Sequence, residues 1–319
     1  MEALRYGILS TSSIAPRFVA AVRQAGAGEI LALSSRSMEK AREKAALWKI
    51  PRAYGSHNEL LKDADIDIVY ISTVNSQHYP WAKAALEHGK HVICEKPCTT
   101  SAAETRALFA LAREKGLYFM EAEKMLLLPA LLEVRRRIEE GCLGRIHMAE
   151  MSHSFPGSYN GWMFDKAAGG GPLLSSGIYA VHLLLWLFGP IAQISGVRSS
   201  TEDGVEWQYI LSGITESGVL FNAKNSTRAI LDNTARIFGT KGWVEIPEYW
   251  KARKAVIHIP GKEPEMVEFP CEHELIYEAM HIKECMEKSL LTSPVVTEEL
   301  SAGGIEALER VKAQWEKEG

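Results

Sequence analysis

The stretch Arg5-Tyr6-Gly7-Ile8-Leu9-Ser10-Thr11-Ser12-Ser13-Ile14-Ala15 joins a short apolar run to the start of a helical pattern. The apolar run predicts a buried strand. Pro16 fits the first turn of the helix that follows, because the N–H that proline lacks would have no partner inside the helix. A strand that leads directly into a helix is the repeating unit of parallel sheets. The stretch therefore predicts an α/β fold that begins near residue 5.

Strand-like and helix-like segments alternate through the first third of the chain. The predicted strands are Ile30–Leu33, Ile68–Ser72, His91–Cys94 and Leu117–Met120, and the predicted helices are Met38–Trp48, Tyr79–His88 and Ser101–Lys115. Alternation at this spacing predicts a doubly wound parallel sheet with helices on both faces, the Rossmann arrangement that binds dinucleotides. We therefore assign residues 1–122 to an N-terminal nucleotide-binding domain.

The pattern changes after residue 122. The glycine run Gly169-Gly170-Gly171 precedes an apolar helix at Ser176–Phe188, and two helices, Leu275–Ser289 and Thr297–Glu318, close the chain. The other predicted elements are a helix at Leu131–Glu140 and strands at Ile146–Ser152, Ile191–Val197, Trp207–Ser212, Val219–Lys224, Ala235–Phe238, Trp243–Ile246 and Val256–Ile259. Consecutive strands joined by short Gly- or Asn-containing turns predict an antiparallel sheet. Residues 123–319 are therefore predicted to form an α+β domain, whose C-terminal helix is a candidate to pack back on the first domain.

The composition is that of an ordinary globular protein. The chain has 319 residues, 36 Lys and Arg, 40 Asp and Glu, and 46% hydrophobic residues. This length favours two domains, and the slightly acidic balance argues against nucleic acid as a partner. The five cysteines form no CxxC pair and no Cys/His cluster has metal-ligand spacing, so we expect reduced thiols and no metal. No apolar run approaches the roughly 20 residues that span a membrane, and Met1–Arg5 does not begin a secretory signal, so a cytoplasmic protein is expected.

The turn between the first strand and the first helix is the expected phosphate site of such a fold, because backbone N–H groups at a helix N-terminus bind pyrophosphate. The usual fingerprint is G-x-G-x-x-G. Here Gly7 remains, whereas Ser10 and Ser12 stand where glycine is common. Serine adds hydroxyl donors, but it adopts left-handed backbone angles less readily than glycine. The candidate cofactor contacts are Gly7, Ser10, Thr11, Ser12, Ser13 and Ile14, and an ordinary polar turn is the alternative.

The end of the second predicted strand indicates which dinucleotide is bound. NAD-binding chains usually place a carboxylate there to bond the ribose hydroxyls. This chain has Ser34-Ser35-Arg36-Ser37 and no carboxylate before Glu39. Arg36 can pair with a 2′-phosphate while Ser35 donates its hydroxyl, so NADP(H) is predicted over NAD(H). A solvated arginine at a strand end is the alternative.

Two motifs follow predicted strands in the first domain, Ser72-Thr73-Val74-Asn75-Ser76-Gln77-His78 and Glu95-Lys96-Pro97. With them the chain resembles the Gfo/Idh/MocA family of oxidoreductases, in particular its branch of dimeric dihydrodiol dehydrogenase and NADP-dependent D-xylose dehydrogenase. The resemblance implies a Rossmann domain followed by an α+β domain with a large, mostly antiparallel open sheet. It also implies an active site between the domains, a small carbohydrate-like or cyclic diol substrate, and a homodimer formed through the sheet.

The resemblance further implies roles for the residues of these motifs. Glu95 contacts the nicotinamide ribose, and the Lys96–Pro97 peptide bond is cis, which proline makes much less costly than any other residue does. Lys96 bonds the reacting oxygen of the substrate and stabilises the negative charge that develops there. The implied cofactor contacts are Ser72, Thr73, Asn75, His78, Glu95, Lys96 and Pro97.

The second implied catalytic element is Ser175-Ser176-Gly177-Ile178-Tyr179. The family pattern has aspartate at the first position and histidine or tyrosine at the last. Tyr179 is the expected general acid/base, and a phenol needs a cationic neighbour to work near neutral pH, for which Lys96 is the candidate. Ser175 replaces the aspartate; its hydroxyl can bond substrate but supplies no charge.

Residues near this element leave alternatives open. Trp162 is a candidate wall of the substrate site, with plain packing as the alternative. His182 either faces the substrate or packs within its helix. The glycine run Gly169–Gly171 either lets the backbone approach the ligand or makes a tight turn. After Glu121-Ala122 the family branch often has a ligand-contacting Trp or Arg, whereas Glu123-Lys124 here either supplies polar contacts or shapes a different pocket.

These observations favour an NADP(H)-dependent oxidoreductase that transfers a hydride to or from a sugar, polyol or cyclic diol. In this hypothesis Arg36 selects the cofactor, Lys96 polarises the reacting oxygen and Tyr179 exchanges the proton. Two alternatives remain. One is a dinucleotide-binding sensor or regulatory protein without turnover, which the replacement at Ser175 suggests. The other is a glycosidase that recycles its bound NAD⁺ in every turnover.

Overall fold

The computed structural model describes residues 3–157 and 161–318. The chain divides into two compact units, each of which is described by itself. The first unit comprises the chain up to Glu123 together with His273–Ser301, and the second comprises Lys124–Glu272 together with the chain from Ala302. This division differs from the continuous one predicted at residue 122, because helix α8 (Leu275–Glu287) packs on α1 (Ala15–Ala25) of the first unit.

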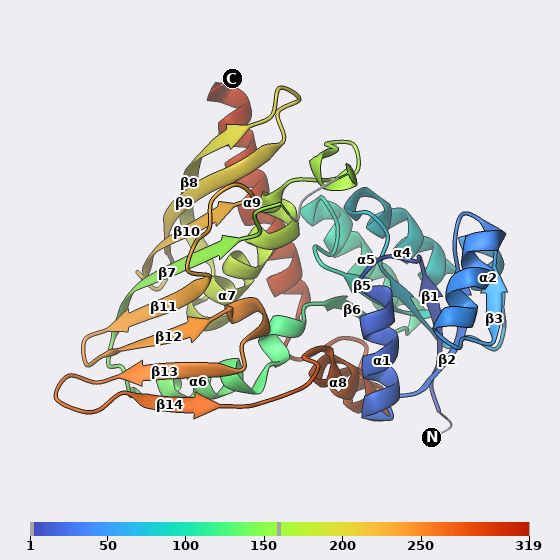
Figure 1. Ribbon diagram of the computed structural model, residues 1–319, viewed down its shortest axis with the longest axis horizontal. Helices are drawn as coiled ribbons and strands as arrows, with labels where there is room; N and C mark the ends of the chain where they lie inside the picture. The colour runs from blue at the N-terminus through green and yellow to red at the C-terminus, as the bar shows by residue number, and fades with distance from the viewer. Residues whose placement is uncertain (1–2, 158–160, 319) are drawn as a thin grey trace. The chain divides into compact units, whose positions relative to one another are not determined.

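The first unit is built on a parallel sheet, as predicted (Figure 1). Its described strands are β1 (Arg5–Leu9), β2 (Glu29–Ser34), β3 (Arg52–Tyr54), β4 (Ile68–Ile71), β5 (His91–Glu95) and β6 (Phe119–Ala122). They lie in the order β3-β2-β1-β4-β5-β6, and every neighbouring pair is parallel. The strand order reverses between β1 and β4, and such a switch point is where doubly wound folds bind dinucleotides. The edge strand β3 was not predicted, because three residues are too few to show a periodic pattern.

The helices of the first unit bury apolar stripes against this sheet. They are α1, α2 (Met38–Leu47), α3 (His57–Leu61), α4 (His78–Glu87), α5 (Ala102–Lys115) and α8. On α1 the buried Phe18 ring stacks on Tyr70 of β4 with 3.7 Å between ring centroids. Gly26 and Gly116, with φ of 56° and 66°, end α1 and α5 in the left-handed conformation that glycine adopts most readily.

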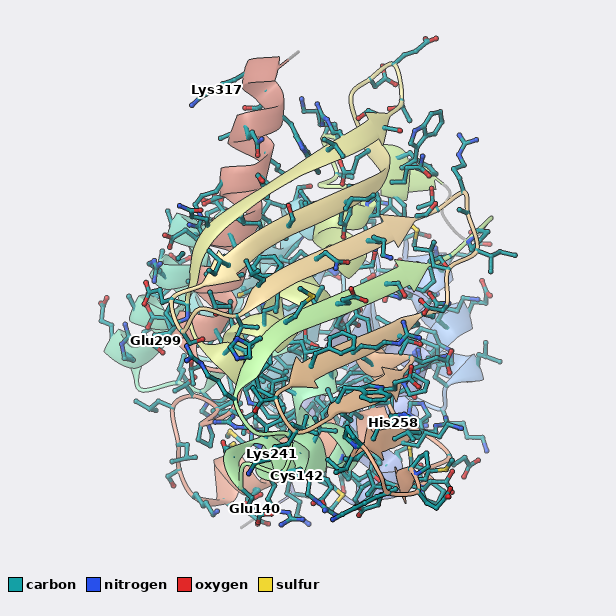
Figure 2. The ribbon with its side chains drawn as sticks, turned by 90° about the vertical axis from the view of Figure 1, so that its left-hand side faces the viewer. Glu140, Cys142, Lys241, His258, Glu299 and Lys317 are labelled. Carbon is teal, nitrogen blue, oxygen red and sulfur yellow. The ribbon has the colours of Figure 1, made fainter. Side chains whose placement is uncertain are left out.

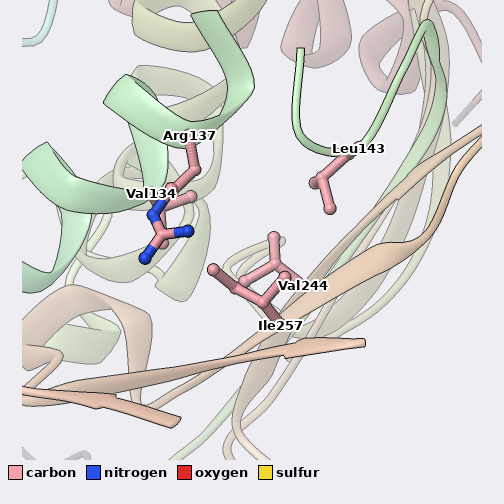
Figure 3. Close-up of a pocket in the computed structure, with 5 residues that line it drawn as sticks. All are labelled: Val134, Arg137, Leu143, Val244 and Ile257. Atoms are coloured by element: carbon pink, nitrogen blue, oxygen red, sulfur yellow. The ribbon is translucent and has the colours of Figure 1, made fainter. Parts of the chain in front are cut away.

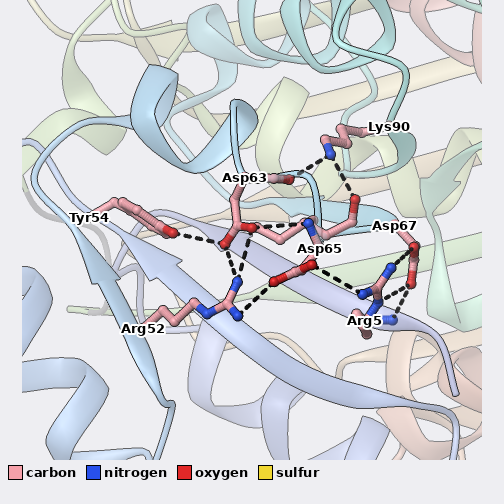
Figure 4. Close-up of polar contacts among 8 residues, drawn as sticks. Arg5, Arg52, Tyr54, Asp63, Asp65, Asp67 and Lys90 are labelled. Carbon is pink, nitrogen blue, oxygen red and sulfur yellow. Dashed lines mark hydrogen bonds and ion pairs between the residues drawn. The ribbon is translucent and has the colours of Figure 1, made fainter.

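A network of ion pairs joins the amino ends of β1, β3 and the segment before β4 (Figure 4). The Arg52 guanidinium donates to Asp63 at 2.7 Å, and the Arg5 guanidinium donates to Asp67 at 2.9 Å. The Lys90 ammonium donates to the backbone oxygens of Asp63 and Ile66 at 2.7 and 2.8 Å. These contacts fix the loop before β4 at the edge of the sheet opposite to the carboxyl ends of the strands.

The second unit is built on a larger sheet of order β14-β13-β12-β11-β7-β10-β9-β8. Its described strands are β7 (Ile146–Ser154), β8 (Ile191–Ser200), β9 (Glu206–Thr215), β10 (Leu220–Ser226), β11 (Thr234–Gly239), β12 (Trp243–Pro247), β13 (Lys254–His258) and β14 (Glu265–Glu268). All neighbouring pairs are antiparallel except β7 and β10, so the predicted mostly antiparallel sheet is confirmed. Figure 2 shows this sheet with its side chains.

Three helices accompany the sheet of the second unit: α6 (Pro129–Glu139), α7 (Ile178–Phe188) and α9 (Glu298–Glu318). The first residues of α9 belong to the first unit, and the helix continues without a break into the second. Between α6 and the sheet lies a packing gap too narrow for a water molecule, lined by Val134, Arg137, Leu143, Val244 and Ile257 (Figure 3). None of the predicted site residues lines this gap, so it is a feature of helix packing.

Two negative observations concern the described residues. Within residues 3–157 and 161–318, no helix combines the length and the apolar content that crossing a lipid bilayer requires. All five cysteines lie in these ranges and all are free thiols, as expected.

Candidate functional site

The turn after β1 has the backbone conformation that glycine usually provides. Ser10 has a φ of 102°, a region that L side chains rarely adopt, and its N–H donates to the Ser34 carbonyl oxygen at 3.1 Å. Holding a non-glycine residue there costs on the order of 1–3 kcal/mol, and such strain concentrates at ligand-binding sites. The turn has therefore kept the backbone path of a glycine-rich phosphate loop although its sequence has serine.

The N-terminus of α1 adjoins this turn. Ile14 is the N-cap residue of α1. Its apolar side chain accepts no hydrogen bond from the backbone N–H groups of the first helical turn. The Ser12 hydroxyl donates to the Ser72 hydroxyl at 2.8 Å and so links the turn to the end of β4. A Cβ at Gly7 would lie 2.8 Å from a methyl group of Leu60 on α3, so glycine allows close packing here, and the contact of Gly7 with the cofactor stays a prediction. Thr11 is half-buried and Ser13 is exposed.

The end of β2 presents the residues predicted to select the cofactor. Ser35 is buried and donates its N–H to the Tyr54 carbonyl oxygen at 3.1 Å, whereas the Arg36 side chain is exposed. The Ser34 hydroxyl lies 2.8 Å from His57 Nδ1. Burial, with a smaller contribution from the Arg36 charge, lowers the pKa of His57 to about 4. His57 is therefore neutral at pH 7, and Arg36 is the cation at this strand end.

The loop after β5, which carries Lys96, is held from two sides. The Lys96–Pro97 peptide bond is cis, so this prediction is confirmed. His78 is buried, and its Nδ1 and Nε2 lie 2.8 Å from the Pro97 carbonyl oxygen and 3.2 Å from the Thr73 carbonyl oxygen. Burial lowers the pKa of His78, and the shorter contact favours a proton on Nδ1. On the other side, the buried Glu121 carboxylate accepts the Cys98 N–H at 2.7 Å.

Glu95 and Lys96 lie side by side at the end of β5. The Tyr70 hydroxyl donates to Glu95 Oε1 at 2.5 Å, and the Lys96 N–H donates to Oε2 at 3.2 Å. Burial, followed by the charge of Glu95, raises the pKa of Tyr70, so this phenol stays protonated and remains a donor. Both carboxylate oxygens of Glu95 are thus oriented, and the Lys96 side chain is half-buried beside them. Asn75 is buried at the start of the turn that leads into α4.

The first unit therefore gathers one group of the predicted residues at the carboxyl ends of its strands. Ser10 and Ser12 follow β1, Arg36 follows β2, Ser72 and Thr73 follow β4, His78 begins α4, Glu95 ends β5, and Lys96 follows it. This is the crevice at which open α/β sheets bind ligands. Trp162, Ser175 and Tyr179 lie in the second unit.

In the second unit, Tyr179 has a cationic neighbour that the sequence did not single out for this role. The Lys124 ammonium donates to the Tyr179 hydroxyl at 2.8 Å and lies 4.9 Å from the centroid of its ring. Lys124 is 8% exposed and Tyr179 is 5% exposed. Lys124 begins a short 3₁₀ turn, Lys124–Leu127, that packs against α7. Lys124 is thus a cation at Tyr179 within the second unit, and the role of Lys96 of the first unit at Tyr179 stays a prediction.

An aromatic cluster surrounds this pair. The His153 ring lies 6.3 Å from the Tyr179 ring, 4.0 Å from Phe155 and 3.6 Å from Trp250, measured between centroids. His153 and Phe155 were not predicted as site residues. The signal that could have found them is their spacing of two at the end of a predicted strand, His153 within β7 and Phe155 directly after it, because alternate residues of an extended chain point to the same side.

The segment before Tyr179 is not the regular helix that was predicted from Ser176. Leu173–Gly177 forms a π-helical turn, and α7 begins only at Ile178. Such turns are rare and often occur at functional sites. The Ser175 hydroxyl donates to the Gly171 carbonyl oxygen at 2.7 Å. With its proton in this hydrogen bond, the hydroxyl can act toward a further group only as an acceptor. Gly177 is required by packing, because a Cβ there would overlap the hydroxyl of Tyr209.

The glycine run before this turn serves packing within the protein. A Cβ at Gly170 would lie 2.6 Å from the Met163 carbonyl oxygen, and one at Gly171 would overlap the Glu206 carboxylate. Glu206 accepts the Leu173 N–H at 2.8 Å, and burial raises the pKa of Glu206. Packing within the chain thus accounts for Gly170 and Gly171, and the approach of this backbone to a ligand stays a prediction. Trp162 lies half-buried on the 3₁₀ turn Gly161–Phe164.

The remaining candidates are resolved by burial. His182 is fully buried, and a Cβ at Gly304 of α9 would overlap its ring, so His182 packs within the second unit. Over the described ranges no three or more His, Cys, Asp or Glu side chains gather as a metal ion would require.

Both parts of the chain match known protein families, and the chain has relatives of similar length. Residues 4–123 match the model described as "Oxidoreductase family, NAD-binding Rossmann fold", and residues 131–245 match "GFO/IDH/MocA C-terminal domain". Trans-1,2-dihydrobenzene-1,2-diol dehydrogenase of Mus musculus is 34% identical over 307 residues, which cover 92% of this chain and 91% of that protein. The Homo sapiens protein of the same name is 33% identical over 305 residues, covering 92% and 91%.

Solved structures with the same fold are also found among oxidoreductases. A 3-ketoreductase from Actinomadura kijaniata, in complex with NADP and TDP-benzene, has a TM-score of 0.89 and 23% identity, covering 98% of each chain. The aldose-aldose oxidoreductase from Caulobacter crescentus, complexed with glycerol, has a TM-score of 0.87 and 25% identity, again covering 98% of each chain. On the family matches and the identity to these relatives, the chain belongs to the Gfo/Idh/MocA family of oxidoreductases.

Proposed function

We propose that this chain is an NADP(H)-dependent dehydrogenase that transfers a hydride to or from a CH–OH or carbonyl group of a sugar, polyol or cyclic diol. The observation that carries the proposal is the strained Ser10 turn, which keeps a glycine-like path beside the start of α1 and the end of β4. The relatives named as dihydrodiol dehydrogenases support the substrate class.

Selection of the cofactor rests on the end of β2. Arg36 is exposed there, the neighbouring His57 is neutral at pH 7, and the strand ends on serines instead of a carboxylate. A guanidinium pairs well with a phosphate dianion, whereas a ribose diol is bound best by a carboxylate. We therefore assign the 2′-phosphate of NADP(H) to Arg36 and Ser35.

The chemistry follows from the residues at the ends of β4 and β5. A bound nicotinamide supplies or accepts the hydride. Lys96 donates to the substrate oxygen and stabilises the negative charge that forms there as the hydride is transferred to a carbonyl. Glu95, oriented by Tyr70, holds the ribose beside it. The His78 and Glu121 contacts keep the Lys96 loop in place, so we assign His78 to positioning instead of direct contact with the cofactor.

Tyr179 is the proposed proton donor and acceptor, with Ser175 and Trp162 at the substrate. In reduction, the Tyr179 hydroxyl gives its proton to the substrate oxygen; in oxidation, the phenolate takes the proton of the substrate hydroxyl. Because the Ser175 proton is donated to Gly171, Ser175 is assigned as an acceptor for a substrate hydroxyl.

We also propose a homodimer formed through the exposed face of the large sheet. Two pairs of neighbouring apolar side chains lie there, Val197 opposite Ile210 and Leu220 beside Met148, and all four are 40–68% exposed. An apolar patch of this kind on a sheet is typical of an interaction surface. Ile210→Lys should convert the dimer to a monomer in sedimentation experiments, whereas an unchanged sedimentation coefficient would argue against this interface.

The cofactor assignment is tested by calorimetric titration of cofactor-stripped protein with NADPH and then NADH. We expect NADPH to bind more tightly by at least about 1.4 kcal/mol, a factor of ten. Arg36→Ala should remove this preference, whereas Arg42→Ala, an exposed arginine on α2, should leave it unchanged. A preference for NADH would contradict the role of Arg36.

The reaction is tested with a panel of sugars, polyols and cyclic diols under the preferred cofactor. Turnover should be lost in Lys96→Met and kept in Lys115→Met, an exposed lysine at the end of α5. Tight binding of NADPH without turnover on the whole panel would favour the sensor alternative. Copurified cofactor that shows no net change in redox state during turnover would favour the glycosidase alternative.

A further inference from the structure

The Lys124–Tyr179 pair is an unusual buried contact. Lys124 is 8% exposed as a residue, and its ammonium lies against a neutral phenol with 2.8 Å between Nζ and Oη. A buried cation is costly unless a charged or strongly polar partner compensates it. The neutral phenol compensates only in part, through one hydrogen bond and through its ring face at 4.9 Å from Nζ. The phenolate would compensate fully, so this site favours the anionic form of Tyr179.

We propose that Lys124 is the positioning residue of the reaction: it fixes the Tyr179 hydroxyl and stabilises the phenolate, so that Tyr179 exchanges a proton near neutral pH. The inference rests on the proposed function. It goes beyond it by naming a second lysine, which acts through the tyrosine, whereas Lys96 acts on the substrate oxygen.

Charged and titratable groups from several elements lie around the Lys124–Tyr179 pair. His153 comes from β7 with its ring centroid 6.3 Å away, and Tyr249 and Lys251 come from the 3₁₀ turn Tyr249–Lys251. Lys251 forms an ion pair with Glu248 at 2.8 Å. Glu123 precedes Lys124 in the chain, and His182 and Arg135 lie on or against α7.

Lys124 keeps all its own protons while the proton moves between Tyr179 and the substrate oxygen. In reduction, the O–H bond of Tyr179 breaks and an O–H bond forms at the substrate carbonyl oxygen, while its carbon receives the hydride from the nicotinamide. The phenolate left behind is stabilised by the ammonium at 2.8 Å, and water then returns a proton to it. In oxidation the same steps run in reverse.

The first test is a double-mutant cycle in the 319-residue chain with NADPH and the carbonyl compound that is reduced fastest in the substrate panel. Lys124→Met and Tyr179→Phe should each lower kcat by at least about 100-fold with a small change in KM. Because Lys124 acts through Tyr179, adding Lys124→Met to Tyr179→Phe should lower kcat no further. Lys124→Arg should restore most of the activity, and Lys262→Met, in an exposed turn, should match the wild type. Multiplicative losses in the double mutant would overturn the proposal.

The second test needs no turnover and therefore separates this inference from the proposed function. The protein is labelled with ¹³C at tyrosine Cζ, and Tyr179→Phe assigns the resonance of Tyr179. The pH midpoint of its ionisation should rise by at least about one unit in Lys124→Met. Lys124→Gln, which keeps a donor without a charge, should behave like Lys124→Met, and Lys124→Arg like the wild type. An unchanged midpoint overturns the role of Lys124, whereas a raised midpoint in a protein without turnover refutes the proposed reaction alone.

Discussion

Replacement of Ser10 by glycine should stabilise the first unit. At φ of 102°, serine is held in a conformation that costs about 1–3 kcal/mol, and glycine removes that cost. Glycine also gains conformational freedom in the unfolded chain, which destabilises the folded state by about 0.5–1 kcal/mol. The difference gives a net stabilisation of about 1 kcal/mol, because no hydrogen bond of the Ser10 hydroxyl has to be replaced at the turn.

Hydrogen exchange of the β1 and β4 amides measures this change within the first unit alone. A gain of about 1 kcal/mol slows exchange roughly fivefold under conditions where exchange follows the opening equilibrium. Ser13→Gly is the matched control, since Ser13 lies three residues away without a positive φ and should lose stability by about 0.5–1 kcal/mol. Equal exchange in Ser10→Gly and the wild type, or an equal gain in Ser13→Gly, would refute the reasoning that Ser10 is strained.

Two further predictions concern His57 and Gly177. The pKa of His57 falls from about 6.5 in the unfolded chain to about 4 in the folded protein, so its contribution is complete above pH 6.5 and is lost as the pH falls towards 4. Up to about 3 kcal/mol is lost over this window; His57→Gln should flatten the acid limb of an unfolding curve, and an unchanged limb would contradict the burial argument. Gly177→Ala should destabilise the second unit by about 1–3 kcal/mol through overlap with Tyr209. Gly303→Ala on α9, where a Cβ meets only Leu185 at 3.6 Å, should instead stabilise it by up to about 1 kcal/mol; equal thermal midpoints for the two variants would show that the overlap is relieved.

Much of the fold could be predicted because its signals are local. Alternating apolar runs and helical stripes located β1, β2, β4, β5 and β6 and most of their helices, and the turns between later runs located the strands of the second sheet up to β13; the short elements α3 and β14 were missed. What could not be predicted depends on distant contacts. The short strand β3 exists because β2 pairs with it, and α8 joins the first unit because it packs on α1 across more than half of the chain.

In the candidate site, too, the features set by local sequence could be predicted and those set by distant contacts could not. The Lys96–Pro97 loop and the Ser10 turn lie within single motifs, so their sequence was sufficient to indicate their geometry. The neighbour of Tyr179 was not predictable, because Lys124 lies 55 residues earlier and only the folded second unit brings the two side chains together. The hydroxyl of Ser175 likewise needed the π-helical turn, since no propensity predicts that its proton returns to Gly171.

The division of the chain into two units has a consequence for how the protein can be cut and recombined. The backbone passes from one unit to the other after Glu123, after Glu272 and again after Ser301, in the interior of α9. No single cleavage can release a complete unit, and a truncated protein that ends at Glu123 loses the helix that covers α1. The last crossing lies within a continuous helix, so α9 contributes residues to both units. A design that replaces the second unit must therefore replace two segments, the one between β6 and α8 and the one that continues α9 after Ser301.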